Sequence, residues 1–303
     1  MPELPEVQTV VDDLNKKVVG RRIQGVWLDW PKMIKDPLDQ QKNKIAHKHV
    51  AIFEKSLEGE KILKVKRRGK NILIYLSGDK LLLVHQKMTG HMLVGRWEIQ
   101  GKKVIPLEPK AVVEDPYNKY IHLILYLDNG KMLALSDLRK FAKAILGERE
   151  QIENLSELVN LGPDALDDSL TLDKFKDALR QAQGKKIKQV LMDPEVIAGI
   201  GNIYSDDILW AAKIHPFRPA NKISLNDLKK MYKAMRAILA KAVKLRGTST
   251  SDFRDTAGKK GGYADYLLVY QREGEPCLRC KTKIKRVKIG GRSAHFCPKC
   301  QRL

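Results

Sequence analysis

Four cysteines constrain this chain more than any other feature, because all of them lie in its last 27 residues. They form two Cys-x-x-Cys pairs, Cys277 with Cys280 and Cys297 with Cys300, and sixteen residues separate the pairs. Two thiol pairs across a gap of hairpin length can place four thiolates tetrahedrally around one zinc ion. Two disulfides are the alternative, and the regular spacing favours zinc. Four protein ligands leave the metal no open position, so we expect a structural ion.

The compartment that the sequence indicates is one in which thiols stay reduced. The first fourteen residues carry acidic side chains where a secretion signal needs basic ones. No apolar run approaches the ~18 residues that cross a bilayer. We therefore expect a protein of the cytosol, associated with the nucleoid, in which disulfides are rare.

The charge of the chain indicates a polyanionic partner. Its 303 residues include 57 Lys and Arg against 36 Asp and Glu, a net charge of +21. Such a balance favours nucleic acid, although a ribosome-bound or merely lysine-rich protein shares it. Residues 277–303 hold nine basic residues and no acidic one. A hairpin over 288–292 would carry Arg292 at its tip, toward a phosphate or a groove, and a solvated basic face is the alternative.

The pattern of apolar residues predicts a β-rich first part of the chain and a helical second part, and the length favours two or more domains. An apolar stripe after Pro5 predicts a helix that ends near Gly20, and short apolar runs from residue 23 to 146 predict an antiparallel sandwich or barrel. The runs 72–76, 81–84 and 121–127 are examples, with turns at 77–79 and 128–130. Helical spacing follows at 170–182, 185–192, 202–212 and 225–245, with Ser224 as a helix start. The Gly/Ser/Thr-rich stretch 246–262 is expected to be a mobile loop.

The N-terminus, Met-Pro-Glu-Leu-Pro-Glu, offers a reactive amine. Removal of Met1 would expose Pro2 as a secondary amine, and the positive end of the following helix would favour its neutral form. Such an amine attacks an aldehyde-level carbon to form an iminium ion, while Glu3 can donate or accept a proton. From these six residues alone, a simple proline-rich helix entry is the favoured interpretation.

Further motifs along the chain decide between a reactive amine and a simple helix entry. They are PELPEV at the start, RRGK at 67–70, HQKMTG at 85–90, DLRKF at 137–141, GIGNIY at 199–204 and the cysteine module. Together they resemble the formamidopyrimidine-DNA glycosylase family, the bacterial repair enzymes for 8-oxoguanine, over almost the whole chain.

The resemblance implies an α+β multidomain fold. Residues 1–148 would form an N-terminal antiparallel β-sandwich with flanking helices, the catalytic domain. Residues 149–262 would form a helix-two-turn-helix DNA-binding domain with a loop that caps the lesion, and 263–303 a β-hairpin zinc finger. It implies one zinc ion, double-stranded DNA with oxidised bases as partner, and action as a monomer.

The resemblance also implies the catalytic residues. The nitrogen of Pro2 would attack C1′ of the damaged nucleotide, and Glu3 would protonate the deoxyribose ring oxygen. The iminium link would then permit β- and δ-elimination, which cut the strand on both sides of the sugar. Glu6 would support the site, and Lys70 and Arg292 would bind phosphates next to the lesion.

DNA contacts are implied at further positions. Met88, Arg139 and Phe141 match the three residues that fill the gap left by the everted lesion, a step that costs stacking and pairing. Asn202 matches a phosphate ligand at a helix start. His85, His122 and Tyr270 also fall on DNA-contact positions of the family. Gln86, Lys87 and Ala142 depart from the residues common there, and the capping loop at 248–262 leaves lesion preference least defined.

Two other functions remain open from the sequence. A sibling glycosylase of the same fold acts on oxidised pyrimidines, but it usually has different residues at the positions of Arg139 and Phe141. A non-catalytic zinc-ribbon protein that binds DNA or RNA would not need Pro2 or Glu3. A redox or metal-sensing role for the cysteines is more remote.

Overall fold

The computed structural model describes residues 1–38, 47–101, 103–182 and 184–303. These residues form two compact units. The first comprises Met1–Val159 and Arg246–Gly262, and the second comprises Asn160–Leu245 and Tyr263–Leu303. The functional division at 148/149 and 262/263 stays a prediction.

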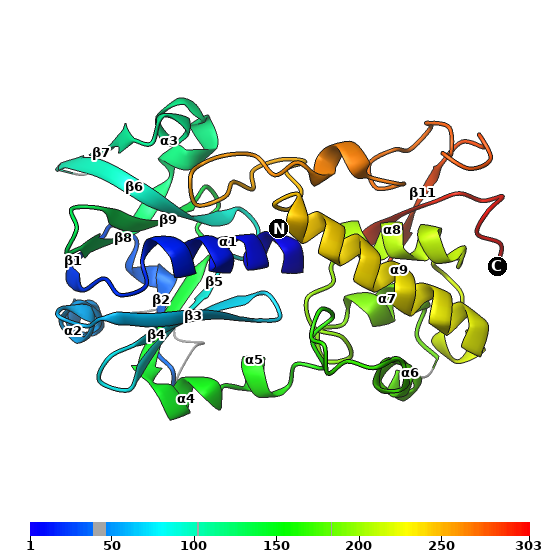
Figure 1. Ribbon diagram of the computed structural model, residues 1–303, viewed down its shortest axis with the longest axis horizontal. Coiled ribbons are helices and arrows are strands. Elements are labelled where there is room, and N and C mark those ends of the chain that lie inside the picture. The colour runs from blue at the N-terminus through cyan, green and yellow to red at the C-terminus, as the bar shows by residue number, and fades with distance from the viewer. Residues whose placement is uncertain (39–46, 102, 183) are drawn as a thin grey trace. The chain divides into compact units, whose positions relative to one another are not determined.

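The first unit contains two five-stranded sheets in its described residues, with the orders β1-β8-β9-β6-β7 and β2-β10-β5-β4-β3. Strand pairs are antiparallel except for the short parallel pair of β2 with β10. The α+β fold with an N-terminal sandwich is thus confirmed (Figure 1). The strands are β1 Ile23–Leu28, β2 Ile34–Lys35, β3 Ile62–Arg68, β4 Asn71–Leu76, β5 Lys80–His85, β6 Gly90–Gln100, β7 Lys103–Glu108, β8 Ile121–Leu127, β9 Met132–Asp137 and β10 Lys143–Glu148.

Helix α1, Leu4–Lys17, runs between the two sheets and supplies part of their common core (Figure 1). Its apolar residues recur at helical spacing, and Val7, Val10 and Leu14 are fully buried against strands of both sheets. The helix begins with a capping box in which Glu3 and Glu6 exchange hydrogen bonds with main-chain N–H groups. The N-terminus of the chain is thereby fixed to the sandwich.

The predicted strands and turns are confirmed. The runs at 72–76, 81–84 and 121–127 lie within β4, β5 and β8. The turn between β4 and β5 uses Gly78 and Asp79 with positive φ angles of 63° and 53°. That conformation suits glycine and aspartate, which explains the turn signal.

The second unit carries the helices expected from the 3–4 spacing, and their ends lie within two residues of the predicted ones. Ser224 caps α9, because its side chain accepts a hydrogen bond from the N–H of Asp227. The helices are α6 Leu172–Gln181, α7 Ile187–Met192, α8 Asn202–Ala212 and α9 Leu225–Lys244. A hairpin of β11, Lys285–Ile289, and β12, Arg292–Phe296, follows.

Short helices connect these elements. They are α2 His47–Leu57, α3 Lys110–Glu114, α4 Arg149–Glu153 and α5 Ser156–Val159, with single turns at Pro31–Met33, Pro116–Lys119, Ala220–Lys222 and Tyr263–Tyr266. Among the described residues, no helix has the length and apolar character that crossing a membrane requires.

The segment 246–262 is a loop that belongs to the first unit, and its mobility stays a prediction. Phe253 is buried in the core of the sandwich. Arg254 is 1% exposed, and its Nε donates to Asp115 Oδ2 at 2.6 Å. At the base of the loop, Arg246 binds both Asp13 of α1 and Asp255. Ion pairs therefore hold the start of the loop, where the Arg246 side chain is half-exposed, and its middle, where Arg254 is buried.

Candidate functional site

Pro2 and Glu3 lie directly before α1 and are both buried. The N–H of Glu3 donates to Glu6 Oε2 at 2.7 Å, and the N–H of Thr248 donates to Glu6 Oε1 at 2.7 Å. Both oxygens of Glu6 therefore bind main chain, so Glu6 joins the helix start to the loop 246–262. Gly247, with a φ angle of 80°, makes this close approach possible because a Cβ there would lie 2.9 Å from the Glu6 side chain. The positive end of the α1 dipole therefore lies beside Pro2.

His85 ends β5 beside two lysines. It lies directly opposite Lys143 of β10, and Lys70 lies in the turn before β4. Burial, followed by the charges of Lys87, Lys143 and Lys70, lowers the pKa of His85 to about 3. The imidazole is therefore neutral at pH 7. Its Nδ1 accepts the N–H of Lys87 at 2.9 Å, so the proton sits on Nε2, which can donate to a phosphate oxygen.

Met88, Arg139 and Phe141 occupy two loops at one end of the sandwich. Met88 is half-buried in the turn between β5 and β6, whereas Arg139 and Phe141 are exposed in the turn between β9 and β10. The guanidinium of Arg139 lies 4.7 Å from the centre of the Phe141 ring, which is 53% exposed. An exposed aromatic side chain and a stacked arginine suit contact with bases.

His122 is buried on β8 rather than open to solvent. Its Nδ1 lies 2.7 Å from Asp29 Oδ1, and within the described residues its Nε2 has no hydrogen-bond partner. The aspartate therefore orients the ring. Contact of His122 with DNA stays a prediction.

Asn202 begins α8 of the second unit, where Gly201 is the N-cap. Asn202, Tyr270 and His295 line one hollow of about 460 Å³ on this unit. The Oδ1 of Asn202 is buried, and it finds no hydrogen-bond partner in the part of the chain that the structure describes. Arg292 is exposed at the start of β12, after Gly290 and Gly291, whose φ angles of 55° and 76° form the two-residue hairpin turn.

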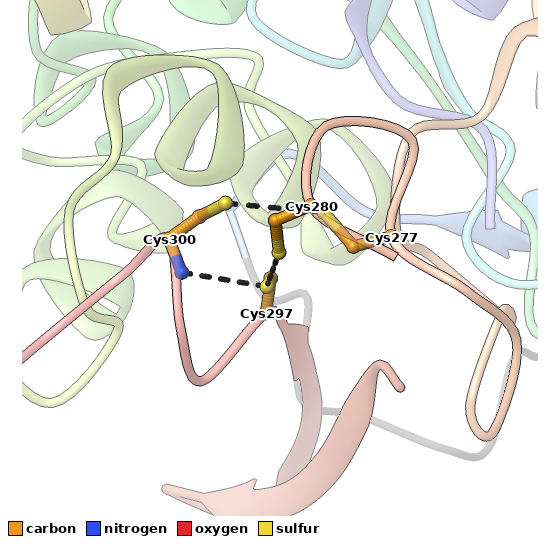
Figure 2. Close-up of side chains that lie close together, drawn as sticks. All are labelled: Cys277, Cys280, Cys297 and Cys300. Carbon is orange, nitrogen blue, oxygen red and sulfur yellow. Dashed lines mark hydrogen bonds between the residues drawn. The ribbon is translucent and has the colours of Figure 1, made fainter. Parts of the chain in front are cut away.

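The four cysteines converge at the base of this hairpin (Figure 2). All four Sγ atoms lie within 4.8 Å of one another, with 3.4 Å between Cys280 and Cys297 and 4.0 Å between Cys277 and Cys300. Tetrahedral thiolates at about 2.3 Å from zinc stand about 3.8 Å apart. These separations fit one zinc ion and exceed by far the ~2.05 Å of a disulfide.

The surroundings of the cysteines favour the same ion. The Nε1–H of Trp210 donates to Cys277 Sγ at 3.4 Å, and the N–H of Cys300 donates to Cys297 Sγ at 3.4 Å. Such N–H groups orient thiolate ligands and stabilise their charge. The Arg279 guanidinium stacks on Trp210 and binds the last carbonyls of α8, which joins the cysteine module to the helices.

Three polar residues that the sequence did not single out join α7, α8 and β12. Asp206 Oδ1 accepts from Lys188 Nζ at 2.5 Å, and Asp206 Oδ2 accepts from the N–H and the Nδ1–H of His295 at 2.9 and 3.0 Å. All three side chains are at most 6% exposed. The next residue, Asp207, accepts main-chain N–H groups of residues 268–270. No local sequence pattern indicates these contacts, because the partners are up to 89 residues apart.

The predicted site residues divide between the two units. Pro2, Glu3, Lys70, His85, Met88, His122, Arg139 and Phe141 belong to the first unit, and Asn202, Tyr270, Arg292 and the four cysteines belong to the second. Their roles toward DNA stay predictions.

Family profiles match three consecutive parts of the chain. They are the formamidopyrimidine-DNA glycosylase N-terminal domain at residues 1–144, the formamidopyrimidine-DNA glycosylase H2TH domain at 161–254, and the zinc finger found in FPG and IleRS at 274–303. The order is the one that the motifs predict.

Individual relatives match over their full length. A protein of Herpetosiphon aurantiacus named formamidopyrimidine-DNA glycosylase is 37% identical, with 99% of this chain and 100% of the relative covered. The solved Lactococcus lactis Fpg in complex with DNA containing Fapy-dG is 30% identical, with a TM-score of 0.81, and the match covers 99% of this chain and 100% of the solved chain. The same enzyme with DNA containing an oxidised pyrimidine is 31% identical, with a TM-score of 0.81 and complete coverage of both chains. The chain belongs to the formamidopyrimidine-DNA glycosylase family.

Proposed function

We propose that the protein is a bifunctional DNA glycosylase and abasic-site lyase that removes oxidised purines from duplex DNA. The observation that carries this proposal is the fixed start of α1, where buried Pro2 and Glu3 stand at the positive end of a helix that Glu6 locks in place. The Fapy-dG complex of the Lactococcus lactis relative supports purine lesions as substrates. Bacterial relatives support the cytoplasm and its nucleoid DNA as the place of action.

The chemistry begins with the nitrogen of Pro2 once Met1 is removed. Its lone pair attacks C1′ while Glu3 protonates the ring oxygen, so the bond from C1′ to that oxygen breaks and the sugar opens. The bond from C1′ to the base then breaks, and the base leaves with the proton released from the Pro2 nitrogen. The resulting iminium ion draws electrons from C1′ and makes the C2′ proton acidic. Loss of that proton expels the 3′ phosphate, and a second elimination through C4′ expels the 5′ phosphate.

The other site residues hold the DNA in this scheme. Phosphates are bound by Lys70, Arg292, Asn202 and the Nε2–H of the neutral His85, and further contacts with the DNA backbone come from Tyr270 and His122. The position in the duplex that the everted lesion vacates is filled by Met88, Arg139 and Phe141. The zinc ion held by the four cysteines has a structural role and keeps the hairpin with Arg292 folded. No step requires a second protein subunit, so we propose a monomer.

Borohydride trapping tests the covalent step. Incubation with a duplex that contains 8-oxoguanine should give a protein–DNA conjugate, and mass spectrometry should map the bond to Pro2. A version that retains a blocked N-terminus serves as control and should not be trapped. Attachment to a lysine, with the blocked version fully active, would contradict the proposal.

Glu3→Gln tests proton transfer. The amide keeps an oxygen that can cap α1, so the fold and DNA binding should persist, while excision of 8-oxoguanine should fall by about 10²-fold or more. Single-turnover rates and binding titrations on the same duplex measure the two effects separately. Undiminished excision would remove Glu3 from the mechanism.

Oxidised pyrimidines are a second candidate class of substrate, which the complex of the Lactococcus lactis enzyme with such DNA favours. Product analysis on duplexes with 8-oxoguanine, formamidopyrimidine, thymine glycol or a bare abasic site separates the classes. We expect faster excision of the two purine lesions than of thymine glycol.

A further inference from the structure

Two loops of the first unit leave neighbouring strands at the same end of a sheet. Gly90, the first residue of β6, lies directly opposite Asp137, the last residue of β9. The turn before Gly90 carries Met88, and the turn after Asp137 carries Arg139 and Phe141. The relative position of the three side chains therefore depends on what joins these two turns.

Asp137 supplies much of that connection. Its side chain is 0% exposed and sits inside its own turn. Oδ2 accepts the N–H groups of Phe141 and Ala142, both at 2.6 Å, and Oδ1 accepts the N–H of Arg139 at 3.2 Å. One carboxylate thus fixes the main chain on both sides of Lys140, which has a φ angle of 59°. The main chain of the turn is thus held by buried hydrogen bonds although its side chains are exposed.

Thr89 extends the connection to the other turn. Its hydroxyl donates to Asp137 Oδ1 and accepts the N–H of Arg139 at 3.1 Å. Thr89 directly follows Met88, so a single hydroxyl joins the main chain beside Met88 to the main chain at Arg139. The partners of Asp137 in the described part of the chain are all uncharged, namely main-chain N–H groups and this hydroxyl.

This arrangement holds main-chain atoms in place and leaves the side chains of Arg139 and Phe141 exposed. The buried carboxylate holds main-chain atoms of the turn after β9 and is joined to the turn before β6 through the Thr89 hydroxyl, whereas the Arg139 and Phe141 side chains project into solvent and stack on each other. Asp137 itself is too deeply buried to touch DNA. Residues that must enter a duplex together gain from such preorganisation, because no ordering is then needed at the moment of insertion.

We propose that Asp137 and Thr89 are positioning residues that set the spacing between Met88 and the Arg139–Phe141 pair, so that the three side chains enter the DNA stack as one unit. This inference rests on the proposed function, in which those three residues replace the everted nucleotide. Asp137 and Thr89 contribute to excision through the geometry of the two turns and not through the chemical step.

Thr89→Val provides the test, with Thr89→Ser as the matched control. Valine keeps the size and branching of threonine but loses the hydroxyl, whereas serine keeps the hydroxyl. Asp137 retains its three main-chain donors in both variants, so the turn after β9 can still fold. The substrates are a duplex with 8-oxoguanine opposite cytosine and a single strand with a preformed abasic site, which has no opposite base to replace.

We expect Thr89→Val to slow excision from the duplex by about tenfold or more, since misplacement by 1 Å can cost up to about 10²-fold. Cleavage of the single strand should change little, and Thr89→Ser should resemble the unmodified protein on both substrates. A 2-aminopurine next to the lesion should report slower unstacking for Thr89→Val. Met88→Ala should give the same split between substrates, which marks it as a defect of insertion.

Three results would overturn the inference. Thr89→Val could excise from the duplex at the normal rate, it could lose both activities equally, or Thr89→Ser could fail like valine. Thermal unfolding of each variant identifies any loss that comes from misfolding, and Asp137→Asn repeats the test from the carboxylate side. If the unmodified protein neither excises nor becomes trapped, it is the proposed function that fails instead.

Discussion

Asp137 in the first unit and Asp206 in the second are both buried, yet they are satisfied in different ways. Asp137 accepts hydrogen bonds from uncharged main-chain and hydroxyl groups. Asp206 binds the ammonium of Lys188 and the ring and main chain of His295. The first arrangement shapes one pair of turns, and the second joins three elements of a unit.

The surroundings of the two aspartates explain the difference. The first unit has a large apolar core between two sheets, which includes α1 and Phe253. Around the zinc module of the second unit the cluster of buried apolar residues is small and includes the ligands Cys277 and Cys297 themselves. A small module with little apolar surface needs a metal or strong polar contacts to fold. We therefore expect the two units to respond differently when metal or charge is removed.

Loss of zinc should produce the largest difference in folding between the two units. Cys297→Ser, or a chelator, should unfold the hairpin, because structural zinc contributes about 10–16 kcal/mol in small zinc-binding peptides. The sandwich should stay folded, and DNA affinity should fall by about 100-fold as phosphate contacts are lost. Zinc content, limited proteolysis and binding titrations measure these effects. Unchanged affinity in a zinc-free protein would show that the second unit does not depend on its metal.

Removal of one buried charge should have the next largest effect. Lys188→Met leaves the carboxylate of Asp206 without its ammonium partner, which typically costs about 3–5 kcal/mol. Hydrogen exchange of main-chain amides in α8 and β12 should accelerate, while exchange in β4 and β5 should not change. Amide exchange followed by mass spectrometry measures each segment separately.

The double variant Lys188→Met with Asp206→Asn is the matched control. Its neutral amide removes the uncompensated charge and can still accept the N–H of His295, so part of the lost protection should return. If the double variant is less protected than Lys188→Met alone, charge is not what holds α8 to β12.

Much of the fold could be predicted because it depends on local signals. The cysteine spacing predicted the zinc module, Ser224 predicted the start of α9, and apolar spacing predicted the helices to within one or two residues. The family could be identified from the order of the motifs, because each motif is short and continuous in the sequence.

The contacts of the buried acids could not be predicted in the same way. Asp137 begins the DLRKF motif, but its bond to Thr89 spans 48 residues and exists only because β6 pairs with β9. Asp206 meets His295 across 89 residues for a similar reason. Hydrogen-bond partners of a buried carboxylate depend on tertiary packing, which single-sequence patterns do not encode.

A rise in pH should increase the free energy of unfolding of the first unit and decrease that of the second, and this is the smallest of the expected effects. Burial holds the pKa of His85 at about 3 in the first unit, below its value of 6.5 when exposed. Between these values the unfolded chain binds the proton more readily, so the free energy of unfolding of the first unit rises with pH from about 3 to 6.5.

Asp207 in the second unit behaves in the opposite sense. Burial, opposed by its main-chain N–H partners, raises its pKa to about 7 from an ordinary value of 3.8. The folded state now binds the proton more readily, so its stabilising effect is complete below pH 3.8 and is lost as the pH rises through about 7. The second unit should therefore lose stability over much of the range in which the first unit gains it.

Amide exchange at pH 4.5 and pH 6.5, corrected for the intrinsic pH dependence of exchange, measures this divergence. Each group contributes up to about 1.4 kcal/mol per pH unit within its window. Asn at position 85 can still accept the N–H of Lys87, so His85→Asn should flatten the rise in β5 and leave the second unit unchanged. Asp207→Asn should flatten the fall around residues 268–270 and leave β5 unchanged. Parallel pH profiles in both units, or profiles that neither substitution alters, would remove burial of these two groups as the cause.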